Sequence, residues 1–266
     1  MGNNRGKKIA LTGLKFDKKS SFMDGCAKGP PLVRESLYSY GTNTTAENGI
    51  DIKLENIIDS GDFEISDLME ISKIIDDFLL SGSRVLSIGG DHSVTYPILK
   101  AYSDHYSGIE ILHIDAHPDL YDELDGDRLS HACPFARIME EKLAVRLVQL
   151  GVRTINSHQK DQADKFGVEI VPMKRFSPER IPKFNNPVYI SIDLDGIDPA
   201  FAPGVSHHEP GGLSSRQVID IIGDLKVPVI GGDVVEYNPE RDVSGITSAL
   251  AAKLVKELLS KMVENG

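Results

Sequence analysis

The stretch His113-Ile114-Asp115-Ala116-His117-Pro118-Asp119 ends an apolar run that begins at Ile109. The apolar part predicts a β-strand over 109–114, which is followed at alternate positions by Asp115, His117 and Asp119. In an extended chain these three side chains would leave the backbone on the same side. Carboxylates this close to one another repel unless a cation joins them. The stretch therefore predicts a strand that delivers three ligands to a divalent metal.

The rest of the chain alternates short apolar runs with amphipathic segments. We expect strands over 8–14, 85–88, 109–114, 147–152, 168–171, 187–194 and 227–235. We expect helices over 66–80, 94–106, 134–142, 155–166, 214–225 and 246–263, a turn leading into a helix over 25–34, and a polar loop over 43–48. Ser66 would cap the first of these helices, and Ser214 with Gln217 would form a capping box. This alternation predicts right-handed βαβ units, a parallel sheet covered by helices on both faces, and one domain over 1–266.

Composition limits the partners of the chain. A formal net charge of −11 argues against nucleic acid and favours a metal or a cationic small molecule. No run approaches the roughly 18 to 20 apolar residues of a membrane span, and residues 1–8 lack the apolar core of a signal peptide. Cys26 and Cys133 are too few for a disulfide framework and are expected to be buried thiols. We therefore expect a cytoplasmic protein that binds neither nucleic acid nor membrane.

Two more motifs place potential ligands at strand ends. Gly89-Gly90-Asp91-His92-Ser93 follows one expected strand, and Asp193-Leu194-Asp195-Gly196-Ile197-Asp198-Pro199 ends another. Ligands of parallel sheets bind outside the carboxyl ends of the strands. We therefore expect a single metal cluster that consists of His92, Asp115, His117, Asp119, Asp193 and Asp195. Six imidazole and carboxylate ligands exceed what one catalytic zinc uses, so two Mn²⁺ ions are expected, with Fe, Ni²⁺, Co²⁺ or Zn²⁺ as alternatives.

Two other side chains could act on a substrate. His131 follows the acidic loop 122–127 and is a candidate acid or base, the alternative being an exposed loop residue. Glu236 follows the last expected strand and could hold a guanidinium through a bidentate pair, the alternative being an internal salt bridge. His207 and His208 lie in a glycine- and proline-rich loop, where they would either line the mouth of a pocket or serve as scaffold.

The remaining histidines are expected to be structural. His113 would pack within its strand, because it precedes the metal motif inside an apolar run. His105 and His158 would lie on helix surfaces. None of the three is expected to bind a metal or a substrate.

Together these motifs resemble the signatures of the ureohydrolases, the family of arginase, agmatinase and their relatives. The resemblance rests on Gly89 to Ser93, Asp115 to Asp119 and Ser191 to Pro199, and it continues through Ser20-Ser21-Phe22, Gly29-Pro30, Ala200 to Gly204 and Asp233 to Glu236. His131 to Glu140 and Gly204 to Gly212 look most like plant-type arginases and agmatinases and their bacterial relatives. The resemblance implies a three-layer α/β/α fold with a mostly parallel central sheet, two Mn²⁺ ions and homo-oligomers built from trimers.

Carried over residue by residue, the resemblance implies a role for each candidate. His92, Asp115, Asp119 and Asp193 would hold one manganese, and Asp115, His117, Asp193 and Asp195 the other. Glu236 would hold the guanidinium, Asp119 would orient a hydroxide that bridges the metals, and His131 would protonate the departing amine. The expected reaction is hydrolysis of a guanidino C–N bond to urea and an amine.

The substrate stays open between agmatine, which would give putrescine, and arginine, which would give ornithine, with agmatine slightly favoured on electrostatic grounds. Tyr121 stands where animal-type arginases carry an asparagine that reads the amino-acid end of arginine, and an acidic loop would attract the distal cation of agmatine. Guanidinobutyrate is less favoured because its carboxylate would meet the same loop. A zinc deacetylase of similar architecture would leave His92, Asp119 and Asp195 unused. A metal-stabilised binding protein would need neither His131 nor an open acidic site.

Overall fold

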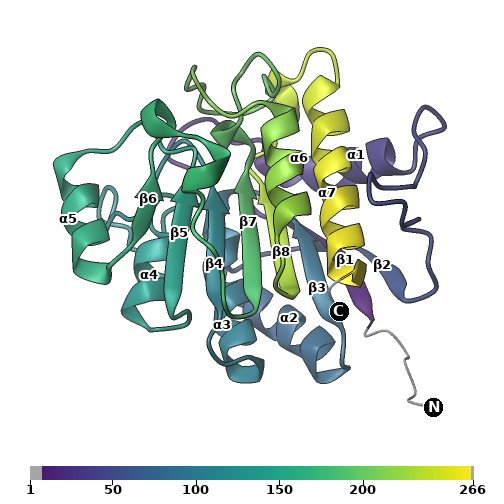
Figure 1. Cartoon of the computed structure of the whole chain (residues 1–266), viewed down its shortest axis with the longest axis horizontal. Coiled ribbons are helices and arrows are strands. Elements are labelled where there is room, and N and C mark those ends of the chain that lie inside the picture. Colours follow the sequence, from purple (N-terminus) through teal and green to yellow (C-terminus); the bar gives the residue numbers. More distant parts are fainter. Residues whose placement is uncertain (1–7, 265–266) are drawn as a thin grey trace.

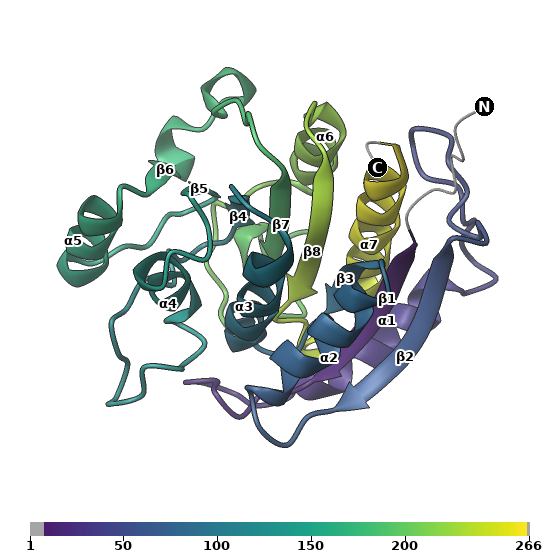
Figure 2. The same cartoon turned by 90° about the horizontal axis from the view of Figure 1, so that it is seen from below.

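Eight parallel strands form one sheet between two layers of helices (Figure 1, Figure 2). The computed structural model describes residues 8–264, so residues 1–7 of the polar, basic start lie outside the described residues. The expected α/β fold with a parallel sheet covered on both faces is confirmed. None of the helices within residues 8–264 is long and apolar enough to cross a membrane.

The strands and helices fall close to their expected positions. The strands are β1 (Ile9–Lys15), β2 (Ile57–Glu64), β3 (Arg84–Ile88), β4 (Glu110–Ile114), β5 (Arg146–Leu150), β6 (Glu169–Val171), β7 (Val188–Asp193) and β8 (Val229–Val235). The α-helices are α1 (Gly29–Leu37), α2 (Glu70–Leu80), α3 (Thr95–His105), α4 (Pro134–Glu140), α5 (Ser157–Phe166), α6 (Ser215–Asp224) and α7 (Ile246–Glu264). Short 3₁₀ turns lie between them, and two of these, η2 (His92–Val94) and η5 (Leu194–Gly196), carry candidate ligands.

The strand order is β2-β1-β3-β8-β7-β4-β5-β6, and every neighbouring pair is parallel. The four central strands are β3, β8, β7 and β4, and their carboxyl ends meet at one edge of the sheet. All residues of these four strands are buried, as expected for strands covered on both faces. The candidate ligands follow these same four ends, which places them together over the middle of the sheet.

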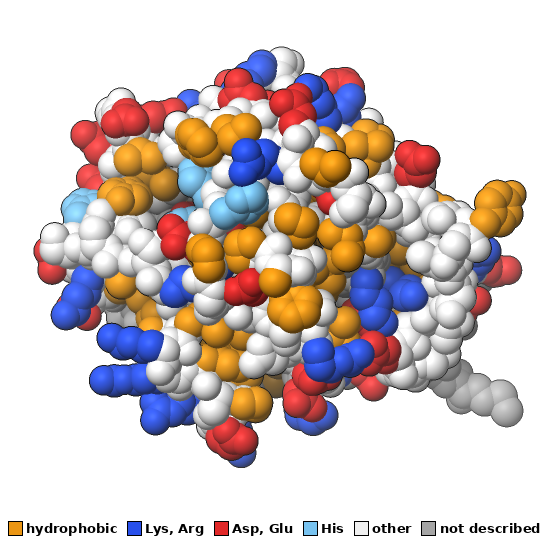
Figure 3. All heavy atoms as spheres, turned by 90° about the horizontal axis from the view of Figure 1, so that it is seen from above, with side chains coloured by type: hydrophobic (Ala, Val, Ile, Leu, Met, Phe, Trp, Pro, Cys, Tyr) orange, Lys and Arg blue, Asp and Glu red, His pale blue; other side chains and the backbone are white. Residues whose placement is uncertain are grey.

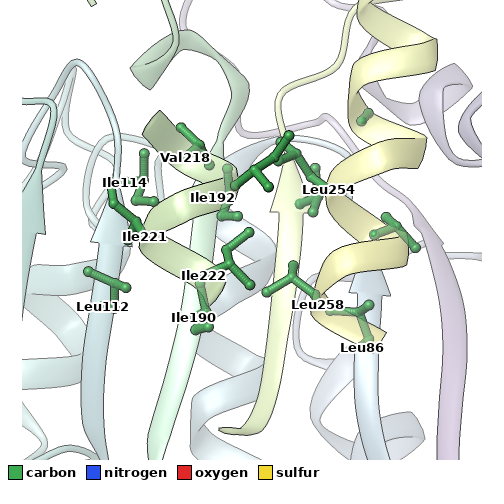
Figure 4. Packing of buried hydrophobic residues seen from close by; sticks show 14 of the residues in the cluster. Leu86, Leu112, Ile114, Ile190, Ile192, Val218, Ile221, Ile222, Leu254 and Leu258 are labelled. Carbon is green, nitrogen blue, oxygen red and sulfur yellow. The ribbon is translucent and has the colours of Figure 1, made fainter. Parts of the chain in front are cut away.

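Helices α1, α6 and α7 cover one face of the sheet, and α2, α3, α4 and α5 cover the other. Figure 4 shows Ile221 and Ile222 of α6 with Leu254 and Leu258 of α7 packed on the central strands. Each fully buried aliphatic side chain of this kind stabilises the fold by about 1.5–3 kcal/mol. The expected capping box is present at the start of α6: the Ser214 side chain accepts from the Gln217 backbone N–H, and the Gln217 side chain accepts from the Ser214 backbone N–H.

Two elements differ from the expectation. Strand β2 was not expected, because it is an edge strand with exposed positions and with Asp59, Gly61 and Asp62 in its sequence, so it shows no apolar run. Helix α2 begins at Glu70, four residues later than expected. Ser66 does not cap it; instead the Ser66 N–H donates to the Glu70 carboxylate at 3.1 Å.

Gly90, which follows β3, packs against the backbone of Phe16, which follows β1, and leaves no room there for a side chain. A Cβ atom at Gly90 would lie 1.7 Å from the carbonyl oxygen of Phe16, which accepts a hydrogen bond from the Asp91 N–H at 2.9 Å. We expect Gly90→Ala to lower the free energy of unfolding by about 1–3 kcal/mol through this overpacking, measured by urea titration. Gly223→Ala is the control, since its Cβ would meet nothing within 4 Å. Equal unfolding midpoints for the two variants would contradict this account.

Candidate metal and substrate site

His92 lies at the centre of the first group of candidate ligands. Its Nδ1 atom is 3.2 Å from Asp115 Oδ2, 3.1 Å from Asp119 Oδ2 and 3.1 Å from Asp193 Oδ2. Its Nε2 atom lies 2.9 Å from Ser191 Oγ, and that hydroxyl donates to Asp233 Oδ1 at 2.6 Å. Ser191 must therefore accept the Nε2 proton, so Nδ1, which faces three carboxylates, is the nitrogen that is left to bind a metal. This is the tautomer that a metal ligand requires.

His117 forms a second group with Asp195 and with Asp115, which belongs to both groups. Its Nδ1 atom is 3.1 Å from Asp195 Oδ2 and 3.4 Å from Asp115 Oδ1. The carboxylates are held by backbone donors, because Asp195 Oδ1 accepts from the Ala116 N–H at 3.1 Å and Asp193 Oδ1 from the Asp195 N–H at 2.7 Å. The six residues expected to form one cluster thus lie together, in two groups joined through Asp115.

The chain reaches this arrangement by turning rather than by staying extended. Strand β4 ends at Ile114, and Asp119 adopts a left-handed backbone with φ of 49°. Glu236, past the end of β8, is also left-handed, with φ of 64°. Such conformations cost about 1–3 kcal/mol in a residue other than glycine and gather at functional sites.

Charge repulsion inside the cluster shows why a cation fits it. Burial and the charges of Asp195 and Asp115 raise the pKa of Asp193 well above its ordinary value. Burial and the charge of Asp115 raise the pKa of Asp195 to about 6. Burial alone would lower the pKa of His92, but Asp115, Asp119 and Asp193 outweigh it and raise that pKa. The protein thus contains a His/Asp cluster that could bind metal, and a divalent ion would relieve this repulsion.

A row of buried polar side chains crosses the sheet beneath the cluster. Residues paired in register on neighbouring strands supply it: Gln149 of β5, His113 of β4, Ser191 of β7, Asp233 of β8, Ser87 of β3 and Thr12 of β1. Gln149 Nε2 lies 2.9 Å from His113 Nδ1, and His113 Nε2 lies 2.9 Å from Asp115 Oδ2. His113 was expected only to pack within its strand; it also donates to a candidate ligand. The sequence signal was a single polar residue inside each apolar run.

We expect Gln149→Leu to weaken metal binding about tenfold. This is the low end of the loss of metal affinity that follows when a residue that orients a metal ligand is replaced. The substitution removes the amide that holds His113 Nδ1 and so frees the imidazole that supports Asp115. Competition with a fluorescent chelator would measure the metal dissociation constant. Gln162→Leu is the matched control, because Gln162 is buried in α5 and has no contact with the cluster. An unchanged constant in Gln149→Leu would show that His113 needs no such support.

His131 and Glu236 form a buried pair beside the cluster. His131 Nδ1 lies 2.9 Å from Glu236 Oε1, and its Nε2 lies 2.8 Å from Ser21 Oγ. Burial alone would lower the pKa of His131, but Glu236 outweighs it and raises this pKa to about 9. Glu236 also accepts from the His92 N–H at 2.9 Å and from the buried Cys26 thiol at 3.3 Å. His131 is therefore a buried imidazolium at neutral pH and not an exposed loop residue.

A cavity of about 360 Å³ opens onto these groups. Its lining residues include the charged groups His117, Asp119, His131, Asp193, Asp195 and Glu236, and the neutral polar side chains of Tyr121, Thr154, Asn156 and Gln159. Figure 3 views this side of the molecule, where histidine and acidic side chains gather among hydrophobic ones. A larger cavity, of about 780 Å³, lies between α6, α7 and the segment 176–184, away from the cluster. The smaller one holds the reactive groups and is the candidate active site.

The acidic loop 122–127 is not the free anionic surface that the sequence indicated. Asp122 Oδ1 pairs with Arg128 at 2.8 Å and with Arg137 at 2.7 Å, and Asp127 Oδ2 pairs with Lys19 at 2.7 Å. These cations neutralise much of the charge that was expected to attract agmatine or to repel a carboxylate. The electrostatic preference for agmatine is therefore weakened.

The other histidines divide as follows. His105 pairs with Asp76 on the helix surface at 2.6 Å, as expected of a surface residue. The ring of His158 stacks on that of Tyr121, with the ring centroids 5.7 Å apart, and the Tyr121 hydroxyl accepts from the Asn156 side chain at 2.6 Å. His158 therefore supports the wall of the cavity. His207 lines the cavity, whereas His208 is exposed, with its Nε2 2.7 Å from the Pro203 carbonyl oxygen. Only the first of these two adjacent histidines lies at the pocket.

Known proteins resemble this chain over nearly its whole length. Arginase 1, mitochondrial, of Arabidopsis thaliana is 44% identical over 277 residues, which cover 95% of this chain and 80% of that protein. The structure of arginase from Medicago truncatula matches with a TM-score of 0.90 at 42% identity, over 96% of this chain and 87% of that chain. Agmatine ureohydrolase of Thermoplasma volcanium matches with a TM-score of 0.84 at 27% identity, over 96% and 90%.

These relatives contradict the expected cytoplasmic location. The similar arginases of Arabidopsis are named mitochondrial and chloroplastic/mitochondrial, and that of Medicago truncatula is named mitochondrial. The cytoplasmic expectation was wrong because charge, cysteine count and hydropathy test only for secretion and membrane insertion. Those quantities do not distinguish the cytoplasm from the interior of an organelle.

The family is settled by the extent of the match. The model of the arginase family matches residues 7–260. Relatives that are 43–44% identical over 95% of the chain are named arginase, which is a ureohydrolase. The expected resemblance to ureohydrolases and the expected arginase-like three-layer fold are therefore confirmed, and the chain is a ureohydrolase that belongs to the arginase family.

Proposed function

We propose that this ureohydrolase holds two Mn²⁺ ions and hydrolyses arginine to urea and ornithine. The observation that carries the proposal is the opening of one cavity onto both the His/Asp cluster and the Glu236 and His131 pair. The first would bind cations that activate water, and the second would bind and protonate a cationic guanidino group. Ni²⁺, Co²⁺ or Zn²⁺ could occupy the same ligands.

The two groups of ligands divide between two ions. His92, Asp115, Asp119 and Asp193 would hold one, and Asp115, His117, Asp193 and Asp195 the other. Two divalent cations there would lower the pKa of a water molecule so that hydroxide is available at neutral pH. A single-zinc deacetylase is not favoured, because it would leave His92, Asp119 and Asp195 without a role although they lie in the same cluster.

The remaining steps fall to the side chains of the protein. Hydrogen bonds from His131 and from the His92 N–H outweigh burial and lower the pKa of Glu236 to about 2. The Glu236 carboxylate would pair with the guanidinium and present the guanidinium carbon to the attacking oxygen. Asp119 would orient the attacking water and accept its proton. As the C–N bond to the substrate chain breaks, His131 would donate a proton to that nitrogen, which leaves as an amine. Urea is the other product.

Arginine is preferred over agmatine for two reasons. The acidic loop is partly neutralised, because Asp122 and Asp127 are paired with cations, so it repels a carboxylate less than expected. The cavity is also lined by the neutral polar side chains of Tyr121, Thr154, Asn156 and Gln159, which can hydrogen-bond an amino-acid group. Agmatine is the second candidate, because Tyr121 replaces the asparagine of animal-type arginases and a matching structure is an agmatine ureohydrolase. Guanidinobutyrate is the third.

We further propose that residues 1–266 form one domain and that the chain assembles into a trimer or hexamer. One continuous sheet supports the first statement, and family resemblance supports the second. Sedimentation equilibrium of the purified protein would test the assembly. A monomer at micromolar concentration would contradict it.

Urea release tests the proposed activity. The protein would be loaded with Mn²⁺, or in parallel with Ni²⁺, and given arginine, agmatine or guanidinobutyrate, while its metal content is measured. We expect two metals per chain and the highest kcat/KM for arginine. No urea from any guanidino compound would refute the proposed activity, and one tightly bound zinc with deacetylase activity would move the assignment to that class.

A further inference from the structure

His207 lies between the two functional parts of the cavity. The centroid of its ring is 5.8 Å from that of His117, a candidate ligand, and 5.5 Å from that of His131, the candidate acid. The ring of Phe22 packs on it at 5.5 Å. His207 is therefore close to the place where a guanidino group held by Glu236 would react.

The backbone around His207 is fixed to the segment that carries Glu236. The Asn238 N–H donates to the Gly204 carbonyl oxygen at 2.8 Å, and the Asn238 side chain donates to Ser206 Oγ at 2.9 Å. The Ser206 hydroxyl in turn donates to the Met23 carbonyl oxygen at 3.1 Å. These bonds hold His207 in a set position relative to Glu236, so its place at the cavity is built in.

The imidazole of His207 has no hydrogen bond to any residue within 8–264, although it is only partly exposed in a polar cavity. Its neighbour His208 differs, because both ring nitrogens of His208 have partners, the Pro203 carbonyl oxygen at 2.7 Å and Arg241 at 3.2 Å. A guanidino group has five N–H donors, and a bidentate pair with Glu236 uses two of them. The donors that remain can be satisfied by an acceptor on the protein.

We propose that His207 is a substrate-binding residue that accepts a hydrogen bond from an N–H of the guanidino group held by Glu236. This inference rests on the proposed function. It assigns His207 to the reacting end of the substrate, because its ring lies beside His117 and His131, whereas the amino-acid end would lie toward Tyr121 and Asn156.

The test compares His207→Ala, His207→Asn and His208→Ala in the Mn²⁺-loaded protein. We expect His207→Ala to lower kcat/KM for arginine about 10- to 100-fold, the effect of losing a hydrogen bond to a charged group, with metal content unchanged. His207→Asn, which keeps an acceptor, should recover part of this loss, and His208→Ala should stay within about twofold of the parent. Binding of agmatine, as substrate or as competitive inhibitor, should weaken by the same factor as binding of arginine.

The outcomes separate the two proposals. Absence of urea release by the parent protein refutes the proposed function, whatever the variants do. With an active parent, an unchanged kcat/KM in His207→Ala overturns the inference. A loss confined to arginine would overturn it as well, because His207 would then contact the amino-acid end. Loss of bound Mn²⁺ in His207→Ala would mean that the residue supports the metal site instead.

Discussion

We expect Asp193→Asn to lose most of its bound divalent metal and to lower kcat more than about a hundredfold. Replacing a residue that supports a ligand lowers metal affinity or activity about 10- to 100-fold, and loss of a direct ligand should exceed that effect. Asp193 is, with Asp115, one of the two aspartates assigned to both ions. Its Oδ2 atom is 3.1 Å from His92 Nδ1, and its Oδ1 atom accepts from the Asp195 N–H. An amide keeps the shape of the side chain but loses the charge that holds two cations. Metal analysis after dialysis and urea release would measure the two effects together.

Asp198→Asn is the matched control for this substitution. Asp198 lies in the same motif, but among the described residues its side-chain oxygens accept from the backbone N–H groups of Ala200, Gly211 and Gly212, away from the cluster. We expect this control to keep both metals. The metal-free form of Asp193→Asn should be no less stable than the metal-free parent, since the substitution removes one of several charges that repel each other. Two metals at full activity in Asp193→Asn would refute the bridging role.

The position of the metal cluster could be predicted from the sequence because parallel strands impose it. Each of His92, Asp115 and Asp193 lies at or just past the end of an apolar run, and such ends meet at one edge of a parallel sheet. No knowledge of strand order was needed for that step. The chemistry of the ligands then followed from residue type alone.

The supporting contacts could not be predicted, because they depend on which strands are neighbours and in what register. His113 meets Gln149 and Ser191 only because β5 and β7 flank β4 with these residues in line. Ser21 reaches His131 across 110 positions of the sequence. The pairing of Asp122 with Arg137 depends likewise on how a loop folds over α4, so the sequence overstated the charge that the loop presents.

His131→Ala is expected to leave both metals bound and to lower kcat about 10²- to 10⁴-fold, the usual contribution of a general acid. His131 bonds no candidate ligand directly, because within residues 8–264 its ring hydrogen-bonds to Glu236 and Ser21. The substitution should therefore remove the proton for the departing amine and nothing from the cluster. His105→Ala, on the surface of α3, is the control and should match the parent. Unchanged turnover in His131→Ala would mean that another group supplies the proton.

The pH profile tests the same role without relying on the size of the loss. The pKa of His131 is about 9, so the imidazolium that can donate a proton persists at neutral pH and is lost as pH rises through that value. In the parent protein kcat/KM should therefore fall on the alkaline side with an apparent pKa near 9, because this constant reports the free enzyme. His131→Ala should lack that alkaline limb. A limb that persists unchanged in the variant would assign it to another group, whereas its disappearance together with intact metal content would identify His131 as the proton donor.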